Sequence, residues 1–457
     1  MNWDVRVIRN RYVDSVRLMK VAQAVRAYDG VTRAEVTMGT AANLAALGVT
    51  AAAGPTDVVI AVQGGGDGAL SAAEAELSAP VAASDGAAPA RARSLLQAEA
   101  NLALISVPGE YAVLEAHRAL TAGMHVFLFS DHVSAEDEVE LKRRGAERGL
   151  LVMGPECGTA MLADVGLGFA NVVRSGPVGI VAAAGTGAQE SAVLLDRAGA
   201  GVSQIIGVGG RDLSARVGGI MFAQAMRTLA ADDETETLLL VSKPPSPDAV
   251  RALGDVDVGG KRVVAAFVGW DGAEAPFEIH PTLDAGAFAA AEAAAPDFDP
   301  GLAARDGRLL GLFSGGSLAH EAVTVLTPKL GAIGGNAGDG STDGHAIFDL
   351  GEEEYTQGRP HPMVDLEVRR RMLEAAGEDV ACVLLDVVLG HGSHPDPAGE
   401  LAPTLAKLRP PVIAHVCGTP DDPQDARAQE AKLRDAGVIV APTNALAARA
   451  AAKAVAA

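Results

Sequence analysis

The feature that most constrains the fold is a short apolar run that leads through glycines into a helical pattern. It occurs first in VGIVAAAGTGAQES, where the predicted buried strand Val178–Ala182 precedes Gly185 and Gly187. Such a turn presents unpaired backbone N–H groups, and the helix dipole adds partial positive charge. Glycine also lets an anion approach the backbone, which a Cβ atom would prevent. The motif alone is equally compatible with an ordinary strand-to-helix turn of a parallel sheet.

The same pattern occurs again in LLGLFSGGSLAHE, with Leu309–Phe313 as the expected strand and a helix from Leu318 onward. Two turns of one type predict two anion sites, which could be the two ends of one phosphate-transfer path. The predicted phosphate-binding residues are Gly185, Thr186, Gly187, Ala188, Ser314, Gly315, Gly316 and Ser317.

Strands alternate with helices along the chain, which is typical of doubly wound parallel sheets. With 457 residues the chain is long enough for about three domains. We expect successive Rossmann- or flavodoxin-like α/β units over residues 1–172, 173–300 and 301–457. Residues 71–93 are Ala-rich and predict an exposed helical insertion or a flexible link. The Gly- and Asp-rich residues 331–369 predict a long loop, functional or disordered.

Composition excludes some classes of partner. The net charge of −21 comes without any block of basic residues, which argues against nucleic acid and anionic membranes as partners. Cys157, Cys382 and Cys417 are too widely spaced for a disulfide framework or a zinc motif. We find no signal-peptide pattern and no apolar run of about 18 residues, so we expect a cytoplasmic protein.

Four segments in succession resemble the α subunit of succinyl-CoA synthetase in order and spacing. They read SVPGEYAVLEAHRALTAGMHVFLFS, LVMGPECGTA, VGIVAAAGTGAQES and IIGVGGRD. From Leu309 the chain resembles the carboxy-terminal ligase domain of that enzyme's β subunit. With RYVDSVRLM near the start and YTQGRPHPMVD late, the chain is identified as a member of the FdrA family, and residues 1–97 match most loosely. The resemblance implies a CoA-binding-like first domain and two ligase-like domains.

The resemblance also implies site residues. The two glycine turns match the helix ends that face the phosphoryl group in the ligases, and residues 154–157 match a turn beside the substrate. The implied catalytic residues are Lys243 and Glu156, although these two could also form a plain ion pair. The implied substrate-binding residues are Gly154, Pro155, Cys157, Gly210, Arg211, Asn336 and His345.

Three departures from the ligases limit the chemistry. VAAFVGWDGAE stands where the ligases carry a phosphorylated histidine, and Lys243 aligns with their supporting glutamate. RNRYVDSV replaces their glycine-rich CoA loop, and no ATP-grasp segment is present. The chain should therefore not make an acyl phosphate from ATP, but it could bind one that arrives ready-made. Lys243 would add positive charge near the phosphate.

The FdrA family is linked to oxamate carbamoyltransferase, with partner subunits, in ureide and purine breakdown. The resemblance therefore implies a carbamoyltransferase-type subunit that handles carbamoyl phosphate and a small amide acid. The alternatives are an acyl-CoA synthetase whose histidine or nucleotide site lies on another subunit, and a scaffold for partner subunits. Carbamoyl phosphate or phosphate is the expected ligand, and CoA binding is doubtful because its loop is absent.

Other side chains are candidate metal ligands or nucleophiles. A loop after a predicted strand carries His391, His394 and Asp396, and the Gly-rich segment carries Asp339, Asp343, His345 and Asp349. Ordinary surface or loop-folding roles are favoured over metal binding for both groups, and we expect no metal. Cys157 could be a nucleophile in an exposed turn, but a small structural residue is the favoured interpretation.

Overall fold

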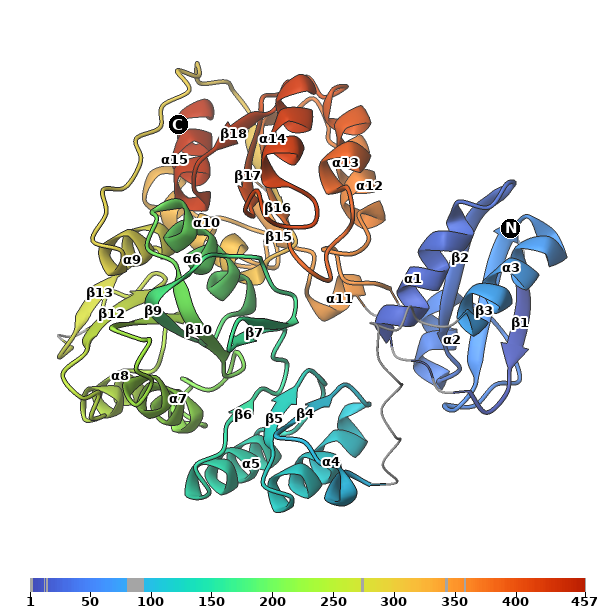
Figure 1. Ribbon diagram of the computed structural model, residues 1–457. Coiled ribbons are helices and arrows are strands. Elements are labelled where there is room, and N and C mark those ends of the chain that lie inside the picture. Colours follow the sequence, from blue (N-terminus) through green and yellow to red (C-terminus); the bar gives the residue numbers. More distant parts are fainter. Residues whose placement is uncertain are drawn as a thin grey trace. The chain divides into compact units, whose positions relative to one another are not determined.

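The computed structural model describes residues 3–11, 13, 15–79, 94–272, 275–341, 344–356 and 359–456 (Figure 1). The chain divides into two compact units. Unit 1 contains Met1–Arg93 together with Glu353–Pro360, and unit 2 contains Ser94–Glu352 and His361–Ala457. This division cuts through the first expected domain, residues 1–172, because the described part of residues 1–93 has a core of its own.

Unit 1 is built on a small antiparallel sheet with the strand order β1-β3-β2. Its elements are β1 (Asp4–Ile8), α1 (Ser15–Arg26), β2 (Val31–Met38), α2 (Ala41–Leu47), β3 (Val58–Gly64), α3 (Gly66–Ser78) and the short α11 (Glu353–Thr356). The prediction of a parallel sheet was wrong here. Helix α1 does connect two strands that run the same way, but β3 pairs between them in the opposite direction, as in a split β-α-β unit.

The expectation of an exposed helical insertion or a flexible link at residues 71–93 can be compared with the structure only over residues 71–79. Residues 71–78 belong to α3, which buries Ala73 and Leu77 against the core of unit 1. The helical part of the expectation is therefore confirmed for residues 71–78, but one face of this helix packs on unit 1, so these residues are not an insertion. The rest of that segment, residues 80–93, lies outside the described residues.

Unit 2 begins with a three-stranded parallel sheet of order β4-β5-β6. The elements are η1 (Leu95–Gln97), β4 (Leu102–Ile105), α4 (Gly109–Thr121), β5 (His125–Leu128), α5 (Ala135–Glu147) and β6 (Val152–Met153). This part carries the Rossmann-like pattern expected for the first domain, but only three strands of it.

The second sheet of unit 2 has the order β13-β12-β11-β9-β10-β7-β8. Its elements are β7 (Thr159–Leu162), β8 (Val165–Gly168), β9 (Ser175–Ala182), α6 (Gly185–Arg197), β10 (Val202–Gly207), α7 (Ile220–Ala230), β11 (Thr237–Ser242), α8 (Pro247–Gly254), β12 (Arg262–Phe267), β13 (Glu278–His280) and α9 (Leu283–Ala290). The strands from β9 onward are parallel, whereas the β7–β8 hairpin adds antiparallel to β10. Residues 159–168 therefore extend the second sheet rather than the first.

The third sheet is parallel throughout, with the order β15-β14-β16-β17-β18. Its elements are β14 (Arg308–Phe313), α10 (Gly316–Leu330), β15 (Ala346–Asp349), α12 (Glu367–Glu374), β16 (Val380–Val388), α13 (Pro397–Leu405), β17 (Val412–Cys417), α14 (Ala426–Asp435), β18 (Ile439–Ala441) and α15 (Asn444–Ala454). The expected parallel α/β sheets are confirmed in this unit. The segment 331–369 is not one long loop, since it contains the edge strand β15.

One hydrophobic core joins the second and third sheets, and helices α6, α9, α10 and α15 pack together between them (Figure 1). Polar side chains are buried where these helices meet. Glu190 of α6 pairs with His415 at 2.7 Å, and Glu321 of α10 accepts hydrogen bonds from Leu283 N at 2.6 Å and Asn444 Nδ2 at 2.8 Å. Each partner lies on a different element, so these contacts fix how the two sheets are joined.

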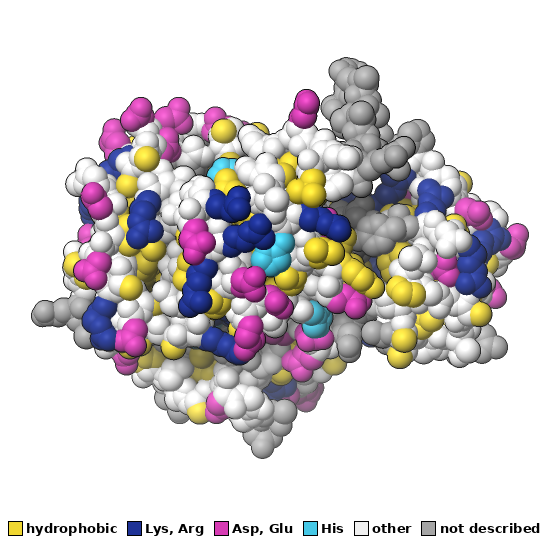
Figure 2. Space-filling view, turned by 90° about the horizontal axis from the view of Figure 1, so that it is seen from below, with side chains coloured by type: hydrophobic (Ala, Val, Ile, Leu, Met, Phe, Trp, Pro, Cys, Tyr) yellow, Lys and Arg dark blue, Asp and Glu magenta, His cyan; other side chains and the backbone are white. Residues whose placement is uncertain are grey.

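No helix among the residues that the structure describes is both long and apolar enough to cross a membrane. On the face of the molecule drawn in Figure 2, lysine and arginine side chains lie among aspartate and glutamate side chains. Although the net charge is acidic, that face carries side chains of both signs.

Candidate functional site

The amino-terminal ends of α6 and α10 meet, so the two predicted turns form one site. Ser317 N donates a 3.3 Å hydrogen bond to Thr186 Oγ1. A Cβ atom on Gly315 would lie 2.9 Å from the Thr186 side chain, and one on Gly187 would lie 3.4 Å from Ser317 Cβ. The close approach of the two turns therefore requires glycine at position 315, whereas a Cβ at position 187 would be in ordinary contact with Ser317. Both helix dipoles direct partial positive charge into the same small region.

Lys243 brings a full positive charge to this region. It follows strand β11, its side chain is exposed, and its Nζ lies 3.6 Å from the position that a Cβ on Gly316 would take. Burial lowers the pKa of His320 on α10, and the nearby charge of Lys243 lowers it further. His320 Nε2 is buried and has no hydrogen-bond partner among the described residues. A neutral imidazole thus lies one turn along α10, beside the lysine.

Asp349 ends strand β15 at the start of α10. The Asn336 side chain holds its backbone on both sides, with Oδ1 accepting from Asp349 N at 2.8 Å and Nδ2 donating to Asp349 O at 2.9 Å. Asp349 Oδ1 accepts from Gly351 N at 2.9 Å, and Oδ2 faces Gly316. Burial raises the pKa of the Asp349 carboxyl to about 6. Asn336, predicted to bind substrate, instead positions this aspartate.

Asp386 already occupies part of the predicted phosphate-binding turn. From strand β16 it accepts hydrogen bonds from Ser314 N at 2.8 Å, Ser314 Oγ at 3.0 Å and Gly315 N at 2.8 Å. Arg369 neutralises it, with Nη2 donating to Asp386 Oδ1 at 2.8 Å, and both side chains are buried. Ser314 and Gly315 are therefore corrected from anion donors to groups that hold Asp386. The signal that could have revealed Asp386 is its place as the single charge in the apolar run VACVLLDVV.

His361 lies beside the same loop as Asp349. A Cβ on Gly351 would lie 2.9 Å from His361 Nε2, and the imidazole ring is 5.8 Å from the ring of Phe169. Burial lowers the pKa of His361 to about 4, so its ring is neutral at physiological pH. His361 lies in the segment YTQGRPHPMVD, which carries part of the family resemblance, but no local pattern indicates that its ring lies beside Gly351 and Phe169.

The predicted substrate turn, residues 154–157, lies at the ends of β5, β6 and β10. Gly154–Pro155 is a cis peptide, and a Cβ on Gly209 would touch this turn. Cys157 is 3% exposed, and burial raises the pKa of its thiol to about 12, which agrees with the favoured interpretation of a structural residue and not with a nucleophile or a substrate contact. Glu156 is exposed, and no ion pair between Glu156 and Lys243 is found among the described side chains.

Of three further residues predicted to bind substrate, one lies near the α6 turn and two make structural contacts elsewhere. Gly210 lies near the start of α6, since its Cβ would be 3.9 Å from Ala183 O. Arg211 turns away to pair with Glu138 at 2.9 Å. His345 lies at the opposite end of β15, where its Nδ1 accepts from Leu309 N at 3.1 Å. Arg211 and His345 are therefore corrected from substrate contacts to structural contacts, while Gly185 and Ala188 stay with the α6 turn.

Three of the candidate metal ligands, His394, Asp396 and Asp339, have other partners. His394 pairs with Glu400 at 2.9 Å, and Asp396 caps α13 and pairs with Lys432 at 2.7 Å. Asp339 is exposed and accepts from Ser341 N at 2.9 Å, whereas Asp343 lies outside the described residues. Within the described ranges, no cluster of His, Cys, Asp and Glu side chains has the arrangement of a metal site.

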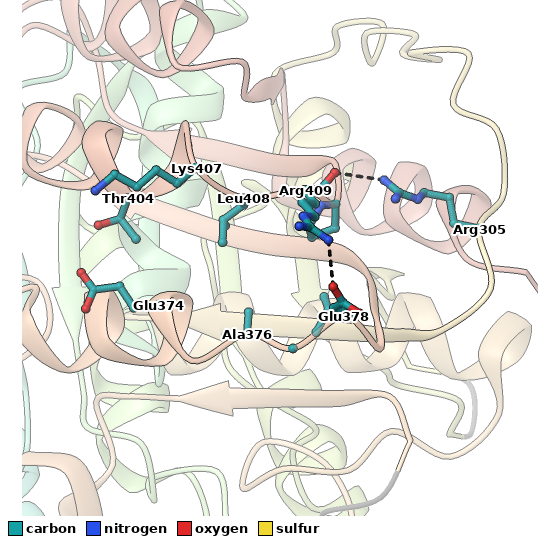
Figure 3. A pocket seen from close by; sticks show the side chains of 11 residues that line it. Arg305, Glu374, Ala376, Glu378, Thr404, Lys407, Leu408 and Arg409 are labelled. Carbon is teal, nitrogen blue, oxygen red and sulfur yellow. Dashed lines mark hydrogen bonds and ion pairs between the residues drawn. The ribbon is translucent and has the colours of Figure 1, made fainter.

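A separate hollow of about 470 Å³ lies at the amino ends of β14, β16 and β17 (Figure 3). Its wall includes Arg305, Lys407 and Arg409 alongside Glu374 and Glu378, and Arg409 pairs with Glu378 at 2.8 Å. Ligands of open α/β sheets bind at the carboxyl ends of the strands, where Lys243, Asp349 and the α6 and α10 turns lie. This hollow is thus distinct from the site described above.

Comparison with known proteins gives two family matches. Residues 312–454 match the family described as CoA-ligase, and residues 1–94 match the family described as "AllF, heavy metal-associated domain". The second match corresponds closely to the first segment of unit 1. Residues 1–94 contain neither cysteine nor histidine. The CoA-ligase match does not distinguish between subunits, so the resemblance of the chain from Leu309 onward to a β-subunit domain stays a prediction.

Relatives extend these matches. "Uncharacterized protein YahF" of Escherichia coli K12 is 35% identical and covers 95% of both chains. "Succinate–CoA ligase [ADP-forming] subunit alpha-2, mitochondrial" of Trichomonas vaginalis is 30% identical over 39% of this chain and 58% of its own length. "Succinate–CoA ligase [ADP-forming] subunit alpha 2" of Archaeoglobus fulgidus is 29% identical over 38% of this chain and 60% of its own. The matches thus span less than two thirds of these ligase subunits.

A solved structure of "dinucleotide forming Acetyl-coenzyme A synthetase 1 (apo form)" from Ca. Korarchaeum cryptofilum aligns with 79% of this chain and 84% of its own, at 15% identity and a TM-score of 0.34. At this score the fold assignment rests on the sheet topology described above. The chain belongs to the family of E. coli YahF, an FdrA-like family, and is a CoA-ligase-like protein with similarity to succinate–CoA ligase α subunits.

Proposed function

We propose that this chain is the acyl-phosphate-binding subunit of an acyl-CoA synthetase-like enzyme. The observation that carries the proposal is the meeting of the α6 and α10 amino termini, with the Lys243 ammonium beside them. Two helix dipoles and one full positive charge favour a phosphoryl group there and would stabilise charge that develops on it during acyl transfer. The family matches support the same class of chemistry.

The donors available to the phosphoryl group lie mainly on the α6 side. The first-turn N–H groups of Thr186 and Gly187 have no helical carbonyl to bind, whereas Gly315 N is used by Asp386 and Ser317 N by Thr186. Lys243 and the Gly316 N–H complete the cradle. In this proposal Lys243 balances the charge of the transferred group, and Glu156 stays a candidate for a contact with the acyl or acceptor part.

CoA is the cofactor that the family matches imply, and the described residues do not fit it. The glycine-rich loop expected after the first strand is absent, and residues 3–79 form an antiparallel unit in its place. No step is therefore derived through CoA. The proposal assigns CoA and nucleotide binding to partner subunits of a hetero-oligomeric, cytoplasmic enzyme.

The same observations favour a second candidate, a carbamoyltransferase-type subunit. Carbamoyl phosphate is an acyl phosphate that needs neither ATP nor CoA, which suits a chain with tryptophan and aspartate in the segment where the ligases carry their histidine. The third possibility, a scaffold for partner subunits, requires no anion binding at all.

Calorimetric titration of the full chain with inorganic phosphate, acetyl phosphate and carbamoyl phosphate tests the shared part of these proposals. Replacement Lys243→Ala should weaken binding by about tenfold, because one charge-assisted contact is lost. Lys407→Ala is the matched control, since it removes an exposed lysine from the hollow in Figure 3. Failure of all three ligands to bind would favour the scaffold.

Product assays separate the two enzymatic candidates. The chain with its co-purified partners is supplied with an acyl phosphate and CoA, or with carbamoyl phosphate and oxamate. Thioester formation supports the acyl-CoA synthetase-like proposal, whereas a carbamoylated product supports the second candidate. If the assembly binds carbamoyl phosphate but forms neither product, this result would contradict both enzymatic candidates.

A further inference from the structure

A carboxylate lies among the cationic groups of the proposed anion site. Asp349 is 6% exposed, and its Oδ2 faces Gly316 at the start of α10. Lys243 Nζ lies 3.6 Å from the same point beside Gly316. Oδ1 accepts from Gly351 N, but no hydrogen bond to Oδ2 is found among the described residues. Oδ2 is therefore an acceptor without a donor, directed at the cradle.

The carboxylate is held firmly in this position. Strand β15 pairs in register with β14, so that Asp349 lies opposite Phe313, and Asn336 binds both the N–H and the C=O of Asp349. These contacts fix the backbone, and the side chain is held by Gly351 N, which donates a 2.9 Å hydrogen bond to Oδ1, so turning the carboxylate out of the site would break that bond. Any anion in the cradle must be compatible with it.

Fixed carboxylates discriminate between anions by protonation. A fully deprotonated oxyanion has no hydrogen to donate and is repelled by the carboxylate. A phosphate that keeps one proton can donate its O–H to the carboxylate while its other oxygens accept from backbone N–H groups and lysine. At neutral pH inorganic phosphate keeps a proton, whereas sulfate, of almost the same size and shape, does not.

We propose that Asp349 makes this site select a phosphate group that carries a proton and reject sulfate and other fully deprotonated oxyanions. The inference rests on the proposed anion site between α6 and α10. It names inorganic phosphate, a substrate or product of acyl-phosphate chemistry, as the ligand that fits without proton uptake. An acyl phosphate dianion would bind together with one proton taken from solution.

The charged groups around Asp349 act in known directions. Burial raises its pKa, and Glu352 and Asp386 raise it further, whereas the Gly351 N–H and Lys243 lower it, with the balance at about 6. His361, next to Gly351, is neutral because burial lowers its pKa to about 4. Asp349 is therefore ionised at neutral pH and becomes a hydrogen-bond donor as the pH falls below about 6, when sulfate should be accepted.

Titration calorimetry with sodium phosphate and sodium sulfate on the full chain at neutral pH tests the inference. Wild type should prefer phosphate by about tenfold or more, the effect of one hydrogen bond to a charged group. Asp349→Asn should bring the ratio close to one, chiefly by strengthening sulfate binding. Asp339→Asn is the matched control, because it removes an exposed carboxylate from a nearby loop and should leave the ratio unchanged.

A second measurement needs no variant. Sulfate keeps the same charge throughout, so wild-type affinity for sulfate should rise at least about tenfold between about pH 8 and about pH 5 as Asp349 gains its proton. The inference would be overturned, and the anion site left intact, if wild type bound phosphate and sulfate with equal affinity at neutral pH. The same holds if its affinity for sulfate did not change with pH. Absence of binding by either anion would overturn the anion site and the inference with it.

Discussion

The buried Glu321 should make unit 2 less stable as the pH rises. Its carboxyl lies between α9, α10 and α15, where it accepts from Leu283 N and Asn444 Nδ2 and is 1% exposed. Burial, together with the nearby charges of Asp284 and Glu190, raises its pKa from the ordinary value of 4.5 to about 8. The folded chain therefore holds this proton more tightly than the unfolded chain does.

The size of the effect follows from linkage. A pKa raised in the folded state gives stability that is complete below about pH 4.5 and is lost as the pH rises through about 8. The full difference corresponds to about 5 kcal/mol of unfolding free energy. Glu321→Gln cannot ionise, so the wild-type advantage over this variant should fall by about 4 kcal/mol between about pH 5 and about pH 9.

The chain has two tryptophans, Trp3 and Trp270, and the assay uses Trp270. In a Trp3→Phe background, urea unfolding followed by fluorescence reports on Trp270, which packs in unit 2. At about pH 5 the glutamine should destabilise by about 1–3 kcal/mol, because its amide cannot accept both hydrogen bonds. Glu147→Gln, an exposed glutamate, serves as control. A wild-type-to-variant difference that stays constant within about 1 kcal/mol across this pH range would refute the reasoning.

Two other predictions concern buried groups. Lys142→Met should destabilise the chain by about 3–5 kcal/mol in thermal or urea unfolding, because buried Asp212, 2.8 Å from its Nζ, would lose its cation, and Glu138, 2.6 Å away, would keep only Arg211. A loss below about 1 kcal/mol would contradict this. Cys157 should resist iodoacetamide in the native chain at neutral pH and react in urea, since its thiol is buried with a pKa of about 12. Mass mapping checks the second, and rapid native labelling of Cys157 would show it to be wrong.

Much of unit 2 could be predicted from local sequence. The apolar runs Val178–Ala182 and Leu309–Phe313 form central strands, and the glycines after them open α6 and α10. These features depend only on hydrophobic pattern and glycine geometry within about a dozen residues. That the two turns meet could not be predicted in this way, because they follow strands of different sheets and Ser317 and Thr186 are separated by 131 positions.

The remaining features depend on contacts between distant residues. Asp386 is separated from Ser314 by 72 positions, so no local pattern could reveal that it uses the donors of the second turn. Arg211 is diverted by Glu138 and His345 by Leu309, again through tertiary contacts. In unit 1, alternation of strands and helices is equally compatible with either direction of β3, because the pattern does not encode where a strand inserts.

The second segment of unit 1 limits how the chain can be shortened. Because Glu353–Pro360 belongs to the same compact body as Met1–Arg93, the polypeptide leaves this body after residue 93, builds most of unit 2, and returns to it once before finishing. Three chain connections therefore join unit 1 to unit 2: one after Arg93, one before Glu353 and one after Pro360. Deleting residues 1–93 would not excise a terminal module, since it would leave residues 353–360 without the body to which they belong. An intact excision requires a second cut and a short connector between Glu352 and His361.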